Sequence, residues 1–255
     1  TPRKGALMPD DVAGTAPDPA PDPGSDPGTA PAPGEPRQRG SRVALAGVVF
    51  AALFVAGWLL LQRSPSVQST DQELLDYLSR PDLRRGSRLA GLYIVPFAGI
   101  AFIWFLAAFR DRIVRAGGRE HTIFATVQLV AGSVFVTAVF AVGASELATV
   151  WVAESMAPDR IDLDAMRPMI AFGAALAQIV AVRSSAVFIA VSTTRARRAG
   201  LFPTWFAVLG WVMAAALLVV ASTWRPVVLV IPAWVLGASI AVLSSRPASG
   251  GVVDA

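Results

Sequence analysis

The sequence contains no cysteine and a single histidine, His121. A chain without cysteine forms no disulfide, thiolate metal site, cysteine nucleophile or iron–sulfur cluster. A single histidine likewise excludes haem ligation by two histidines of the chain and a zinc site built from several histidines. We therefore expect no bound metal and no other cofactor.

Charged residues are also scarce, at 16% of the chain, whereas 54% of the residues are hydrophobic and seven are tryptophan. A soluble domain needs a more polar surface than this composition provides, so it indicates an integral membrane protein. The net charge of +4 comes mostly from arginines at the ends of apolar runs. Such arginines set orientation in a membrane, so we expect membrane lipids and no nucleic acid as partners.

Six apolar runs have lengths close to the roughly 20 residues that cross a bilayer as a helix. They predict an all-α fold, a bundle of six transmembrane helices that occupies residues 41–246 and is followed by a short tail at 247–255. Residues 1–40 are rich in proline, aspartate and glycine, and we expect a disordered, cytoplasmic tail there. The six runs cover approximately residues 43–61, 89–109, 122–143, 169–191, 205–222 and 227–243.

A short helix is predicted between the first two runs. The sequence Thr70-Asp71-Gln72-Glu73 matches a capping box, and Leu74, Leu75 and Leu78 follow at helical spacing. Pro81 should end this helix. The leucines either pack on the bundle or lie on the membrane surface, and packing is the favoured interpretation.

The second apolar run contains a proline, Pro96. Proline lacks the backbone N–H that an α-helix uses, and its ring clashes with the preceding turn. We therefore expect a kink within residues 90–97, with the freed backbone groups bonded elsewhere in the bundle.

Five carboxylates lie in the loop predicted between the third and fourth runs. Oxygen ligands suit a hard cation such as calcium, but their spacing matches no known calcium-binding loop, and Arg160 lies among them. Solvated charge is the favoured interpretation. The five are Glu146, Glu154, Asp159, Asp162 and Asp164.

Arginines in the predicted loops give an orientation. The loops after the second and fourth runs are strongly basic, which places both loops, and with six spans both termini, in the cytoplasm of a bacterial inner membrane. Three arginines fall on the other side, in a segment with several acidic residues: Arg84, Arg85 and Arg88.

One arginine, Arg183, lies near the middle of the fourth run. An arginine at the bilayer centre costs about 2.5–3.5 kcal/mol on insertion scales, so it should face other helices or a wet cavity. Gln128 on the third run is a polar group that tends to turn inward, and the two could meet. Together with Gln178 and Ser184, they form a candidate intramembrane polar site.

Several segments together resemble a family of uncharacterised bacterial multi-pass membrane proteins. They are LYIVPFAGIAFIWF at 92–105, RDR at 110–112, FATV at 124–127, VRSSAVF at 182–188, STT at 192–194 and the turn GLFPTW at 200–205. The similarity covers roughly residues 89–243 and includes an intramembrane arginine at Arg183, whereas Thr204 stands where the family usually has a basic residue. The resemblance implies a helical bundle and no particular activity.

Two functions remain open at this point. The first is a structural bundle that binds a membrane-protein partner, lipid or another copy of itself, with small residues Gly173, Ala177 and Ala181 allowing close helix contact. The alternative is a transporter or channel for a small solute or anion, in which Arg183 binds the anionic group. An enzyme is not expected, because Ser184 and Ser185 have no general base and no catalytic residues can be assigned.

Overall fold

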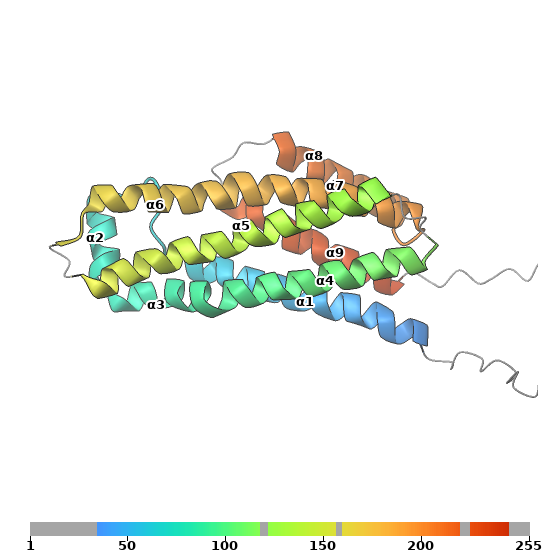
Figure 1. The fold of residues 1–255 in the computed structure, drawn as a ribbon, viewed down its shortest axis with the longest axis horizontal. Helices are drawn as coiled ribbons and strands as arrows, with labels where there is room; N and C mark the ends of the chain where they lie inside the picture. The colour runs from blue at the N-terminus through green and yellow to red at the C-terminus, as the bar shows by residue number, and fades with distance from the viewer. Residues whose placement is uncertain (1–34, 118–121, 157–159, 220–224, 245–255) are drawn as a thin grey trace, which may run out of the picture. The chain divides into compact units, whose positions relative to one another are not determined.

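The computed structural model describes residues 35–117, 122–156, 160–219 and 225–244 (Figure 1). Backbone contacts divide the chain between residues 35 and 36, and the helical bundle belongs to the unit that begins at Pro36. The described residues form helices and turns and contain no strand, which confirms the all-α prediction. The first helix begins at Glu35, inside the segment predicted to be a tail, and residues 1–34 lie outside the description.

Two of the long helices are each built from three consecutive segments. Helices α3 and α4 are joined by a π-helical turn at Ala90–Ile94, and α6 and α7 are joined by a second π-helical turn at Leu176–Ala181. The helices are α1 (Glu35–Leu61), α2 (Asp71–Ser79), α3 (Pro81–Leu89), α4 (Val95–Arg115), α5 (Thr122–Ser155), α6 (Leu163–Ala175), α7 (Val182–Arg198), α8 (Thr204–Val219) and α9 (Val230–Ser244), with a 3-10 turn at Arg225–Leu229 before α9.

Five of the described helical stretches are long and apolar enough to cross a membrane. This supports a membrane-embedded protein but differs from the predicted six spans, because α8 has only 16 residues and the last residues of the predicted fifth run lie outside the description. The five are Ser41–Leu61, Pro81–Arg115, Ile123–Ser155, Leu163–Arg198 and Pro226–Ser244.

Three of these stretches are longer than predicted, with 35, 33 and 36 residues. At ~1.5 Å per residue they extend about 50 Å, well beyond the ~30 Å of a hydrocarbon core. Polar residues at the ends of the apolar runs therefore continue the helices and do not form loops. Glu146 and Glu154 lie on α5, and Arg112 and Arg115 lie on α4, which ends where Gly117 adopts a φ of 84°.

The parts of the long helices that extend beyond the predicted apolar runs at one end of the bundle pack together with α2. Helices α2 and α3 pack against the end of α5 and the start of α6, and we call this group the cap layer (Figure 1). The predicted capping box is present, since Thr70 Oγ1 accepts from the Glu73 backbone and the Thr70 backbone donates to Glu73 at 2.9 Å. Leu74 and Leu78 are buried while Leu75 is 40% exposed, so packing on the bundle is confirmed for two of the three leucines.

The core of the remaining bundle is largely aromatic. Phe102 of α4 contacts Phe50 of α1 and Phe188 of α7, with ring centroids 5.0 and 5.2 Å apart. Phe188 in turn contacts Trp234 of α9 at 5.8 Å, and Trp234 meets Phe109 near the end of α4. These edge-on contacts join four helices through fully buried side chains.

In the segment where a kink is expected, the structure has a π-helical turn at Ala90–Ile94, directly before Pro96. A π turn is a common way to absorb an irregularity inside a helix. It lies where Gly91 meets α5, and a Cβ at Gly91 would be 2.8 Å from the carbonyl oxygen of Gly143. The two backbones therefore approach closely at a point where each helix has a glycine.

Candidate functional site

Arg183 lies in the first turn of α7, immediately after the second π-helical turn. Its Nη1 donates to the carbonyl oxygen of Gln178 at 3.3 Å. Gln178 lies within that π turn, and the backbone N–H of Val182 at the end of the turn donates to the carbonyl of Ile179. The π turn therefore supplies an acceptor for the guanidinium from its own helix.

Ser184, another predicted site residue on this stretch, also bonds locally. Ser184 Oγ donates to the carbonyl of Val180 at 2.7 Å and lies 3.2 Å from that of Ala181. Arg183, Ser184 and Gln178 are all half-buried. They form a polar segment of one helix, and the hydrogen bonds of Arg183 and Ser184 keep those two side chains close to its backbone.

Gln128 is not part of this group. Its amide donates to Ser192 Oγ at 2.8 Å, and its carbonyl oxygen accepts from Nη1 of Arg195. Gln128 and Ser192 are completely buried and Arg195 is 7% exposed. Ser192 and Arg195 lie about 14 and 18 Å further along the helix than Arg183, at ~1.5 Å per residue. The expectation that Gln128 meets Arg183 was therefore wrong.

Arg195 is the polar residue that sequence reasoning missed. Its neighbours Arg197 and Arg198 suggest a basic loop, but α7 continues through all three arginines. Two small polar residues, Ser192 and Thr193, precede it on the helix and are themselves buried. Ser192 lies three residues, or one turn, before Arg195, and this spacing is the signal that marks the arginine as inward-facing.

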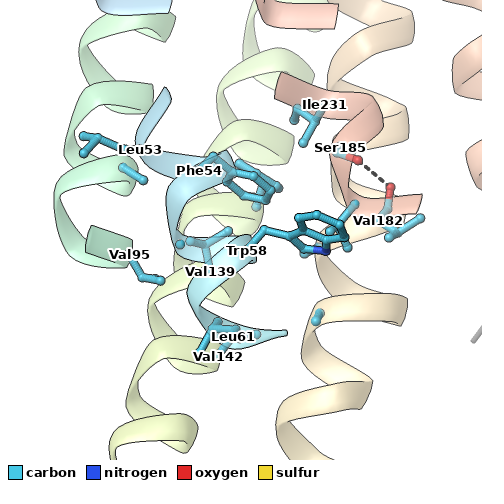
Figure 2. Close-up of a pocket in the computed structure, with 16 residues that line it drawn as sticks. Leu53, Phe54, Trp58, Leu61, Val95, Val139, Val142, Val182, Ser185 and Ile231 are labelled. Carbon is cyan, nitrogen blue, oxygen red and sulfur yellow. Dashed lines mark hydrogen bonds between the residues drawn. The ribbon is translucent and has the colours of Figure 1, made fainter. Parts of the chain in front are cut away.

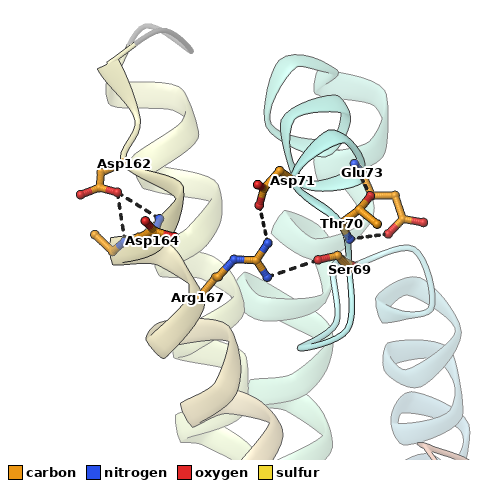
Figure 3. A network of polar contacts seen from close by, with 8 residues as sticks. Ser69, Thr70, Asp71, Glu73, Asp162, Asp164 and Arg167 are labelled. Carbon is orange, nitrogen blue, oxygen red and sulfur yellow. Dashed lines mark hydrogen bonds and ion pairs between the residues drawn. The ribbon is translucent and has the colours of Figure 1, made fainter.

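The carboxylates of the predicted acidic loop are dispersed. In the part of the chain that the structure describes, no three histidine, aspartate or glutamate side chains lie together as metal ligands. Asp162 instead caps α6, because its Oδ1 accepts from the backbone N–H groups of Asp164 and Ala165 (Figure 3). Asp159 lies outside the described residues.

Arginine side chains form hydrogen bonds and an ion pair between the segments of the cap layer. Arg167 of α6 pairs with Asp71 and donates to the Ser69 carbonyl at 3.3 Å, across the space between α6 and α2 (Figure 3). The buried Arg84 donates to the carbonyl of Leu78 and, at 3.0 Å, to that of Ala153. Burial in this layer also raises the pKa of the Tyr77 hydroxyl above its ordinary value.

A cavity of about 120 Å³ lies between α1, α4, α5, α9 and the helix that carries Arg183. Trp58 reaches from α1 toward Val182 and Ser185, and Val139 and Val142 of α5 form the opposite wall (Figure 2). Ser185 is the only lining residue with a hydroxyl, and that hydroxyl already donates to the Val182 carbonyl at 2.7 Å. Arg183 does not line the cavity, which offers almost only hydrocarbon surface.

No protein-family model, curated protein or solved structure matches this chain. The resemblance to bacterial multi-pass membrane proteins therefore rests on the motif residues alone. The features of this chain that bear on function are the geometry of the cavity and the polar groups around it.

The buried hydrogen bonds of Gln128 predict a stability difference between two glutamines. Replacing Gln128 with leucine removes the acceptor of a buried guanidinium and should lower the free energy of unfolding by about 1–3 kcal/mol. The matched control is Gln178→Leu, because the hydrogen bond at Gln178 uses the backbone carbonyl. Thermal unfolding of both purified variants in detergent measures the difference, and equal midpoints would contradict the assigned role of Gln128.

Proposed function

We propose that this protein is a non-catalytic, lipid-interacting membrane bundle that accommodates a hydrocarbon chain in the cavity beside Trp58. The observation that carries the proposal is the chemistry of the cavity wall. Its lining comes from five helical stretches and contains one hydroxyl, that of Ser185, which is already hydrogen-bonded. A polar solute would lose its hydrogen bonds to water there without gaining others, whereas a hydrocarbon chain has no hydrogen bonds to lose.

The position of the cavity also supports a lipid ligand. Val95 and Ala98, which follow the first π turn, line one side, and Ala177 and Ala181 of the second π turn line another. π-helical turns shift the side-chain register of a helix and often occur at functional sites. Small residues at these turns leave the space that larger ones would fill.

Filling the cavity should remove the ligand. We expect Ala177→Phe to reduce photo-crosslinking of a lipid with a diazirine on its acyl chain, as measured by mass spectrometry of the labelled peptides. The control is Ala175→Phe, at an exposed position two residues away on the same helix. Wild-type protein should be labelled on α1 and α5 peptides that line the cavity. Equal labelling of these peptides in both variants, with both eluting as folded protein, would refute the proposed site.

A second candidate function, an anion transporter or channel, is favoured by one observation. In the part of the chain that the structure describes, the only hydrogen bond of the Arg183 guanidinium is to a carbonyl, which leaves its positive charge without a carboxylate. A charge in such surroundings attracts an anionic group. This candidate is the weaker one for two reasons. Gln128 bonds to Ser192 and lies away from Arg183, and the cavity is apolar.

Thermal shifts separate the two candidates. For a lipid-interacting bundle, small anions should shift the melting temperature of wild-type protein and of Arg183→Gln equally, and the variant should melt lower because the Gln178 carbonyl loses its donor. Arg183→Lys, which keeps the charge, is the matched control. Stabilisation of the wild type and Arg183→Lys by an anion, absent in Arg183→Gln, would favour the anion site instead, because a ligand stabilises only the state that binds it.

We further propose six membrane crossings with both termini in the cytoplasm of a bacterial inner membrane. Helix α8 is short, at 16 residues, but it lies between α7 and α9 in the chain and packs mainly on α7. The arginines at the ends of α4 and α7 favour a cytoplasmic position for those ends. Helix α8 thus acts as the fifth crossing.

The absence of cysteine makes this topology directly testable. Single cysteines at Gln68 and Ser244, both exposed, are separated by five crossings if α8 crosses and by four if it does not. A membrane-impermeant maleimide should label Gln68→Cys in intact cells and Ser244→Cys only after permeabilisation. Labelling of both positions from the same side would mean that α8 does not cross, and the reverse pattern would invert the orientation.

A further inference from the structure

The end of the bundle away from the cap layer has a groove between the α7–α8 turn and the last turns of α9. Its volume is about 840 Å³. Its apolar walls include Phe202 and Phe206 on one side and Ile240 on the other, whereas Arg197, Thr204 and Ser244 supply its polar groups. The groove is therefore amphipathic, unlike the cavity beside Trp58.

The polar part of the groove is suited to an anion. Arg197 is exposed, and its Nη2 donates to Thr204 Oγ1 at 2.9 Å, which holds the guanidinium at the start of α8. The first backbone N–H groups of an α-helix have no partner within the helix and, with the helix dipole, favour negative charge. A phosphate near Thr204 would thus meet a guanidinium and a helix N-terminus together.

This end of the bundle carries mostly positive charge. In the described parts of α4 and α7, the last turns contain six arginines and a single carboxylate, Asp111, which pairs with Arg115 on the next turn of α4. Phe109 near the end of α4 contacts Phe202 of the α7–α8 turn, with ring centroids 5.9 Å apart, so the two helix ends are neighbours. The six are Arg110, Arg112, Arg115, Arg195, Arg197 and Arg198.

We infer that this groove binds an anionic phospholipid. Its phosphate lies against Arg197 and the first turn of α8, and one acyl chain lies along Phe206 and Ile240. Trp205, which lines the groove and is 68% exposed, is the kind of residue that settles at a membrane interface. The proposal is independent of the hydrocarbon cavity, which lies at a different level of the bundle and shares none of its lining residues.

The experiment compares two lipids with the same acyl chains. Native mass spectrometry of the full chain measures the affinities for dioleoyl phosphatidylglycerol and dioleoyl phosphatidylcholine. Wild-type protein should prefer the anionic lipid. Arg197→Gln should weaken its binding about fivefold, the loss expected for one arginine at an anionic surface, with little change for the zwitterionic lipid. Arg197→Lys keeps the charge and should retain most of the preference.

Controls test whether the binding belongs to the groove. Arg198→Gln removes the same charge one residue away, from a guanidinium that stacks 5.1 Å from the Phe124 ring, and should leave the preference largely intact. Ala241→Phe fills the apolar part and should weaken both lipids. Ala177→Phe, in the other cavity, should leave the preference unchanged, so failure of either proposal can be recognised separately.

Three results would overturn the inference. Equal losses in Arg197→Gln and Arg198→Gln would indicate diffuse attraction to a basic surface. Unchanged binding of both lipids in Ala241→Phe would show that no acyl chain enters the groove. Displacement of phosphatidylglycerol by millimolar glycerol 3-phosphate would assign the site to a soluble phosphate compound.

Discussion

The contact of α4 and α7 with α5 is the constraint on which the rest of the structure depends. Apolar side chains gain little from association in lipid, so close contact requires small residues and well-fitted surfaces. On α5, Gly132 faces Leu106 and Phe188, and Gly143 meets Gly91 with no side chain between them. Helix α5 is thereby held between the two stretches that contain π turns, and both the cavity and the cap layer depend on their spacing.

The polar side chains inside this bundle form hydrogen bonds either across a helix contact or within their own helix. Gln128 and Arg195 join α5 to α7 by a buried hydrogen bond, and Arg183 bonds to the carbonyl of Gln178, in the second π turn of its own helix. A buried charged group without such a partner would be costly, so each arginine needs a specific acceptor. Gln128 and Arg195 thus stabilise the contact of α5 with α7, whereas Arg183 bonds within its own helix, and the cavity between the helices stays apolar.

The two proposed lipid sites differ in chemistry. The cavity beside Trp58 is lined by helices and offers almost only hydrocarbon contact, while the groove near Arg197 combines aromatic walls with positive charge. Lipids present these same two chemistries, an acyl chain and a phosphate.

The sequence by itself determined the all-helical class, the apolar stretches, the capping box at Thr70 and the irregularity before Pro96, because each depends on residues close together in the chain. Helix lengths were underestimated, since hydropathy marks the part of a helix that suits lipid and not the point where hydrogen bonding ends. Only the tertiary structure decided that Gln128 meets Arg195 and not Arg183. That pairing depends on how α5 and α7 are rotated and shifted against each other, and this is set by side-chain packing between residues far apart in sequence.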